Sequence, residues 1–131
     1  MQLLDHVSIT VRNLKLVKPF YSAVMLALGA RIAYESPDAI GFGERNDAND
    51  DTHTYISVFE SVDAVPDSRR HWCFRANSIA QVNAFHAAGI AAGGTDAGSP
   101  GARNYHAGYY AAFLLDPEGN KIEAVFHHAE A

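Results

Sequence analysis

The sequence predicts an α+β fold made of two similar halves. Patterns typical of strands and helices alternate along the chain, and the chain also repeats itself. Aligned without a gap, "DHVSITVRNLKLVKPFYSAVMLALGA" and "RHWCFRANSIAQVNAFHAAGIAAGGT" superpose His6 on His71, Val17 on Val82, Phe20 on Phe85, Ala23 on Ala88 and Gly29 on Gly94. We therefore expect one domain over residues 1–131, with a first module at about 1–62 and a second at about 68–128.

Each half is expected to begin with a strand and a helix, followed by further short strands. The first half predicts a strand at Val7–Val11, a helix from about Lys15 to Leu28, and strands at Ile40–Gly43 and Tyr55–Phe59. The second predicts a strand at His71–Ala76, a helix capped near Ser78, a strand at Tyr109–Leu115, a turn at "DPEG" and a closing strand in "GNKIEAVF". Pro19 leaves the start of the first helix open, because proline fits a helix best in its first turn.

Composition limits the classes of partner. The net charge is −5 and the Lys and Arg residues are scattered, so we expect no nucleic acid to bind. The single cysteine, Cys73, excludes an internal disulfide, and the charged N-terminal stretch does not resemble a signal peptide. No segment approaches the roughly 18 consecutive apolar residues of a membrane span. We expect a cytoplasmic protein with no membrane partner.

Polar residues share one face of the predicted strands. Side chains alternate along a strand, so in "HVSITV" the residue His6 lies opposite the apolar face. The same parity holds for His71 in "HWCFRA" and for Glu123 in "IEAVF". An isolated buried carboxylate is costly, so Glu123 should be exposed, protonated, paired or bound to a metal. If both halves form one curved sheet with the helices outside, the three side chains can converge on Zn²⁺, Fe²⁺ or Mn²⁺.

The segments "LDHVSITV", "FYSAVMLALGA", "HWCFRA" and "FLLDPEGNKIEAV" resemble, in their order and spacing, the glyoxalase, bleomycin-resistance and extradiol dioxygenase superfamily, also called vicinal oxygen chelate proteins. The resemblance covers nearly the whole chain. It implies two βαβββ modules whose strands form a cupped mixed sheet around a divalent metal, with the helices outside. It also implies metal ligation by His6, His71 and Glu123.

One position departs from the pattern of the family's lactoylglutathione lyases. These enzymes have a carboxylate or amide ligand in the last strand of the first module, where "YISVF" places Ser57. The remaining ligands resemble the two-histidine, one-carboxylate site of the dioxygenase and fosfomycin-thiol-transferase branches. Lactoylglutathione lyase activity is therefore not expected, and the metal is left open among Zn, Fe, Mn, Ni and Co.

The stretch "SPGARNYHAGYYAAF" predicts a binding loop that leads into a strand. Its spacing is similar to the extradiol dioxygenase signature, although Phe113 stands where that signature has tyrosine. The catalytic candidates are His106, Tyr109 and Tyr105. The substrate-binding candidates are Arg103, Tyr110, Ser57 and Trp72. Aromatic packing beside a solvated turn is the alternative interpretation.

Two functions remain open at this point. The first is a metal-dependent enzyme, a dioxygenase or a lyase or transferase, that binds its substrate through vicinal oxygens and stabilises a developing oxyanion. The alternative is a metal-free protein of the bleomycin-resistance kind that sequesters a flat ligand. In either case we expect a homodimer. Each of its two sites would take His6 from one module and His71 with Glu123 from the other.

Overall fold

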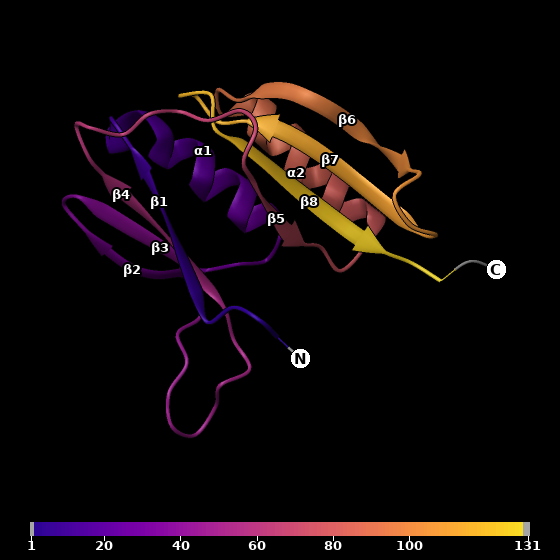
Figure 1. Cartoon of the computed structure of the whole chain (residues 1–131), viewed down its shortest axis with the longest axis horizontal. Coiled ribbons are helices and arrows are strands. Elements are labelled where there is room, and N and C mark those ends of the chain that lie inside the picture. Colours follow the sequence, from indigo (N-terminus) through magenta and orange to yellow (C-terminus); the bar gives the residue numbers. More distant parts are fainter. Residues whose placement is uncertain (1, 130–131) are drawn as a thin grey trace.

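The computed structural model describes residues 2–129 and consists of two βαβββ modules (Figure 1). The first contains β1 (His6–Val11), α1 (Leu14–Ala27), β2 (Ile32–Ser36), β3 (Ala39–Gly43) and β4 (Tyr55–Glu60). The second contains β5 (His71–Arg75), α2 (Ile79–Ala91), β6 (Thr95–Arg103), β7 (Tyr109–Leu115) and β8 (Lys121–His127). The predicted α+β fold is confirmed.

The strands form two four-stranded mixed sheets with the same topology. Their orders are β1-β4-β3-β2 and β5-β8-β7-β6. In each sheet the first pair, β1 with β4 and β5 with β8, is parallel, and the other pairs are antiparallel. Within one chain, the concave surface expected of the fold is therefore divided between two sheets.

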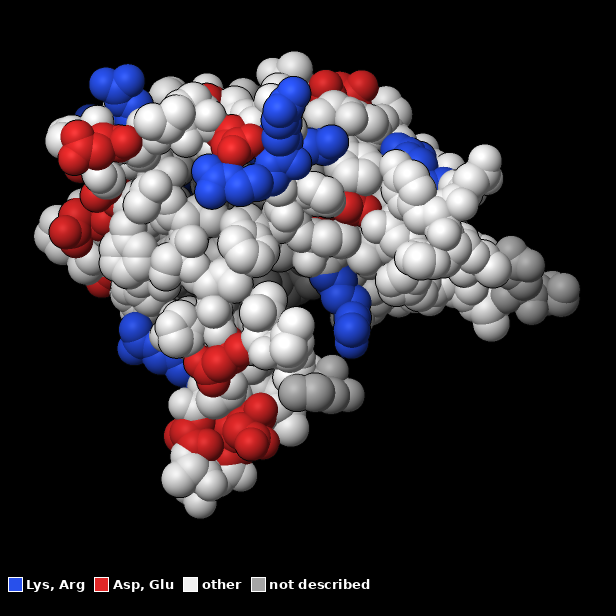
Figure 2. Space-filling model, viewed as in Figure 1, with Lys and Arg blue, Asp and Glu red and all other residues white. Residues whose placement is uncertain are grey.

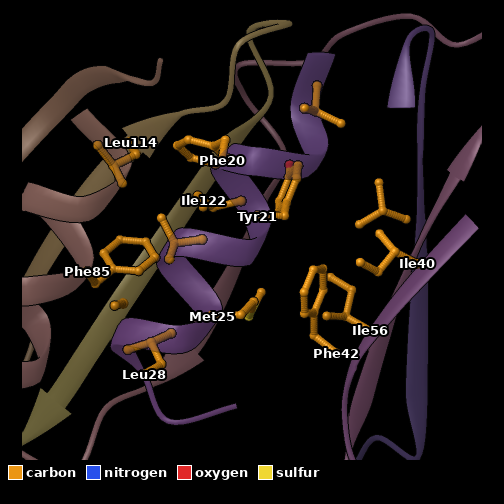
Figure 3. Close-up of a cluster of buried hydrophobic side chains, with 14 of the residues drawn as sticks. Phe20, Tyr21, Met25, Leu28, Ile40, Phe42, Ile56, Phe85, Leu114 and Ile122 are labelled. Atoms are coloured by element: carbon orange, nitrogen blue, oxygen red, sulfur yellow. The ribbon is translucent and has the colours of Figure 1, made fainter. Parts of the chain in front are cut away.

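The helices join the modules through a shared apolar core. In Figure 3, α1 directs Tyr21 and Met25 toward β3 and β4 of its own module, and Phe20 toward Phe85 and Leu114 of the second module. Helices α1 and α2 also contact each other. This contact is close at Gly89, where an added Cβ would lie 2.3 Å from Cδ1 of Leu114. One large cluster of buried residues therefore spans both modules, and the second module adds a small cluster of its own on the other face of its sheet.

Each sheet turns one face toward the helices and leaves the other free of them. The expected parity is confirmed: Val11, Ile122 and Ala124 are fully or almost fully buried in the shared core. Glu123 and Phe113 alternate with these residues and lie on the opposite face of the second sheet. The helix-free faces are therefore where polar side chains can meet a ligand.

Two strands and one helix boundary differ from the sequence-based expectation. The sequence does not predict β2, and it predicts a binding loop at "SPGAR", which is part of β6. Strand β6 is an edge strand with register shifts around Gly98, and an edge tolerates Pro100, which has no N–H to donate. Helix α1 starts at Leu14 with Asn13 as its N-cap, so Pro19 lies inside the helix.

The turn between β7 and β8 docks on the first module. The Asp116 carboxylate accepts a buried 2.6 Å hydrogen bond from the Tyr21 hydroxyl. The Glu118 carboxylate accepts the backbone N–H groups of Arg12 and Asn13, each at 2.7 Å, just before α1 begins. These bonds fix the orientation of one module against the other. Between residues 2 and 129, neither helix has the length and apolar character needed to cross a bilayer.

Candidate functional site

Glu123 lies at the centre of the candidate site, on the helix-free face of β8. The residue is 2% exposed, yet both carboxylate oxygens have partners. Nε2 of His71 lies 2.9 Å from Oε1, and the Tyr109 hydroxyl donates to Oε2. A buried carboxylate is tolerated when its oxygens are hydrogen-bonded, so the two neighbours explain how this strand accommodates an acidic residue.

Strand register brings these side chains together. In the parallel pair, His71 lies opposite Lys121 and Cys73 opposite Glu123. On the other side of β8, Phe113 of β7 lies opposite Glu123, and the His71 ring meets the Phe113 ring edge-on with centroids 5.8 Å apart. The site is thus built on three adjacent strands of one sheet, which hold it more rigidly than a loop would.

The surroundings of Glu123 keep the Tyr109 phenol and the Cys73 thiol protonated. Burial, followed by the hydrogen bond to Glu123, raises the pKa of the Tyr109 phenol. Although Cys73 as a residue is exposed, desolvation of its thiol and the nearby Glu123 charge raise its pKa to about 12. Both groups are therefore neutral near pH 7, and the Cys73 thiol is not an activated nucleophile.

His6 and Ser57 lie in the other sheet. Nδ1 of His6 is 2.6 Å from a carboxylate oxygen of Asp5, and the His6 ring stacks on Tyr55 with centroids 4.9 Å apart. Ser57 is buried and accepts a 2.7 Å hydrogen bond from the Tyr34 hydroxyl. Within one chain, these residues do not join His71 and Glu123. Across residues 2–129, no three His, Cys, Asp or Glu side chains gather closely enough to hold a metal ion.

The adjacent pair still fits part of a metal site. His71 offers an imidazole nitrogen and Glu123 a carboxylate oxygen, which are the donor types that Zn²⁺ and Fe²⁺ accept. The Tyr109 hydroxyl donates to the second carboxylate oxygen, and hydrogen bonds of this kind commonly orient carboxylates that bind metals. One further histidine from outside this sheet would complete a two-histidine, one-carboxylate set.

The remaining candidates from the sequence divide into two groups. The rings of Tyr105 and His106 lie 5.1 and 5.8 Å from the Tyr109 ring, beside a second pocket of about 360 Å³ that His106 helps to line. Arg103 also lines that pocket, but its guanidinium donates to the carbonyls of residues 99 and 101 in its own strand. Tyr110 points the other way and donates a 2.7 Å hydrogen bond to an Asn in α2. The structure therefore places Tyr105 and His106, but not Tyr110, beside Tyr109, which is the hydrogen-bond partner of Glu123.

A pocket of about 460 Å³ lies beside His71, between the edge of β1 and the linker that joins the modules. Trp72 lines it and is 39% exposed, so its indole is available to a ligand. Lys121 also lines it, although the sequence pattern alone does not single this residue out. The available signal is parity, because Lys121 precedes Glu123 by two positions in a strand and so shares its face.

Comparison with known proteins identifies the family. The family model described as Glyoxalase/Bleomycin resistance protein/Dioxygenase superfamily matches residues 3–124. The chain belongs to this superfamily. A glyoxalase/bleomycin resistance protein from Albidiferax ferrireducens T118 is 31% identical with a TM-score of 0.80, and the match covers 97% of this chain and 100% of that chain.

Solved structures with lower sequence identity share the fold. A family enzyme from Burkholderia phytofirmans PsJN is 22% identical with a TM-score of 0.67, over 95% of this chain and 98% of that one. The fosfomycin resistance protein FosX from Mesorhizobium loti is 16% identical with a TM-score of 0.65, over 98% and 94% of the two chains. No match is found among curated proteins.

Proposed function

We propose that the protein is a divalent-metal-dependent enzyme of this superfamily, acting on a small substrate that binds through vicinal oxygens. The observation that carries the proposal is the contact between His71 and Glu123, which combines an imidazole and a buried carboxylate on a helix-free sheet face. A bound divalent ion would supply Lewis-acid stabilisation to an oxyanion or enolate of the substrate. Dioxygenase and lyase or transferase chemistry both fit this role.

The third ligand in this proposal is His6 of a second copy of the chain. The His6 ring lies on the helix-free face of the first sheet, and its side chain is 51% exposed. A symmetric dimer would let this face of one copy meet the second sheet of the other, giving two equivalent sites. In this arrangement each metal site takes ligands from both copies, which would explain why His6 lies apart from His71 and Glu123 within one chain.

The residues around Glu123 would hold and move protons. The Tyr109 phenol stays protonated at neutral pH and donates to Oε2, which fixes the carboxylate. His106 borders the pocket on the other side of Tyr109 and is the exposed candidate for accepting a proton from the substrate. Tyr105 would limit access to this pair.

Metal analysis of purified protein tests the proposal. We expect wild-type protein to retain stoichiometric metal after dialysis, and the His71→Ala variant to lose it. His86→Ala is the matched control, because His86 of α2 pairs with Asp96 of β6 and is no part of the site. Equal metal content in the wild-type and His71→Ala proteins would refute the metal site.

A second test addresses the shared site. The His6→Ala and His71→Ala proteins are refolded together, and metal is measured in the mixed dimer. We expect about half of the wild-type metal content, because one of the two sites then has all its ligands. Absence of any recovery would place the ligands within single chains. Sedimentation of a 14.2 kDa species alone at micromolar concentration would exclude the dimer.

A metal-free binding protein is the second candidate. The hydrogen bonds of His71 and Tyr109 already satisfy Glu123 without an ion, and Trp72 and Tyr105 expose aromatic surface to a flat ligand. Ligand binding that a chelator does not change, without turnover, would favour this function.

A further inference from the structure

The pocket beside His71 contains a positive charge without a partner. Lys121 reaches the helix-free face next to His71, and Nζ lies 4.9 Å from the centroid of the Phe113 ring. Across residues 2–129, no carboxylate lies within ion-pair distance of Nζ. An ammonium resting on an aromatic face is held in place but keeps its hydrogen-bonding capacity.

The other charges of the pocket compensate each other. Nε of Arg70 lies 2.7 Å from Oδ2 of Asp67. Asp67 also accepts the N–H groups of residues 69 and 70, and these bonds lower its pKa to about 2, so it is ionised at neutral pH. Among the residues that line the pocket, Lys121 is therefore left as a positive charge without an ion-pair partner, in a chain whose overall charge is −5. Figure 2 shows basic side chains gathered where the linker reaches β5.

We propose that the substrate is an anion and that Lys121 binds its carboxylate or phosphoryl-type group. The reacting oxygens would then face His71 and Glu123, and an apolar or aromatic part of the molecule would lie against Trp72. Ser8 and Thr10 of β1 also line the pocket and could add hydroxyl donors. This inference rests on the proposed function, because it names the substrate class of the same site.

Calorimetric titration of metal-free protein with three related probes tests the charge requirement. The probes are benzoate, phenylphosphonate and the neutral benzamide. We expect the two anions to bind at least about tenfold more tightly than benzamide, the range expected for a charge-assisted hydrogen bond. The anion that binds more tightly identifies the group type. Equal binding of benzamide would overturn the proposal.

Variants assign the effect to Lys121. Lys121→Met is expected to weaken anion binding about tenfold or more, and Lys121→Arg to retain most of it. Arg75→Met is the matched control. Arg75 lies in β5 on the same face as His71 but outside the pocket lining, so this variant loses one positive charge nearby and should bind the anions with wild-type affinity. Unchanged binding by Lys121→Met, or an equal loss in Arg75→Met, would overturn the proposal.

The metal measurements separate this inference from the function on which it rests. Anion binding that depends on Lys121 in a protein that retains no metal would refute the metalloenzyme and leave the Lys121 site standing. Metal retention that depends on His71, with anion binding indifferent to Lys121, would refute the Lys121 site alone.

Discussion

Tyr21 of α1 and Asp116 of the β7–β8 turn form a buried hydrogen bond of 2.6 Å between the two modules. The Asp116 carboxylate also accepts the N–H groups of Glu118 and Asn120 and the side-chain amide of Asn120. The same carboxylate therefore shapes its own turn and anchors that turn to the first module.

Removing the Tyr21 hydroxyl should destabilise the protein. We expect Tyr21→Phe to lower the free energy of unfolding by about 1 to 3 kcal/mol, because a buried carboxylate oxygen loses the shorter of its two hydrogen bonds and keeps only the one from the Asn120 amide. Urea denaturation measures the change. Tyr105→Phe is the control, since Tyr105 is 59% exposed, and an equal effect of both substitutions would contradict the assigned role.

Stability should fall in alkaline solution because of the same tyrosine. Burial, the Asp116 charge, the hydrogen bond to Asp116 and the Glu118 charge raise the pKa of Tyr21 well above 10.0. Above about pH 10, the unfolded chain releases this proton because its tyrosine has the ordinary pKa, while the folded chain keeps it. The free energy of unfolding therefore decreases as pH rises. Denaturation between pH 8 and 11 should show a smaller decrease for Tyr21→Phe than for wild type. Parallel curves for the two proteins would contradict this linkage.

Glu118 should stabilise the start of α1 from across the module boundary. Its two oxygens accept the N–H groups of Arg12 and Asn13, so Glu118→Ala leaves two backbone donors without these partners. We expect a loss of about 1 to 2 kcal/mol, similar to the loss of a helix cap. Thermal unfolding measures it. Asp63→Ala, a change at an exposed linker acid, should have little effect, and a wild-type melting temperature for Glu118→Ala would argue against the contact.

Gly89 should resist substitution although it lies within a helix. Alanine usually favours helix formation over glycine by about 1 kcal/mol. Here its Cβ would lie 2.3 Å from Leu114 and 3.1 Å from both Phe20 and Val24, and all three residues are fully buried. We expect Gly89→Ala to destabilise the protein by about 1 to 3 kcal/mol, because the overpacked core must rearrange. A stabilised variant in chemical denaturation would show that this helix contact is looser than described.

Sequence alone can predict the faces of the strands and much of the second half of the site. The two-residue period is a local property, so it is enough to place Ile122 in the core and Glu123 on the opposite face. The repeat likewise relates His6 to His71. The sequence cannot predict that His6 and His71 lie on different sheets, because strand pairing and module packing depend on long-range contacts.

The elements that the sequence does not predict also have physical reasons. The glycines and the proline of Thr95–Arg103 are typical of loops, and only pairing with β7 at an edge makes this segment a strand. A single lysine in the sequence does not indicate a binding role for Lys121. The residue becomes informative when β5, β7 and β8 bring His71 and Phe113 beside it.

The apolar core shared by the modules also determines how the polypeptide can be divided. A backbone cut in the exposed linker between Val62 and Asp63 would separate the modules in sequence but leave every contact between α1 and α2 possible. Each fragment alone would expose the large side chains that now meet at this helix pair, together with one unpaired member of the Tyr21–Asp116 bond. The fragments should therefore fold by complementation, as two chains that become ordered when they associate.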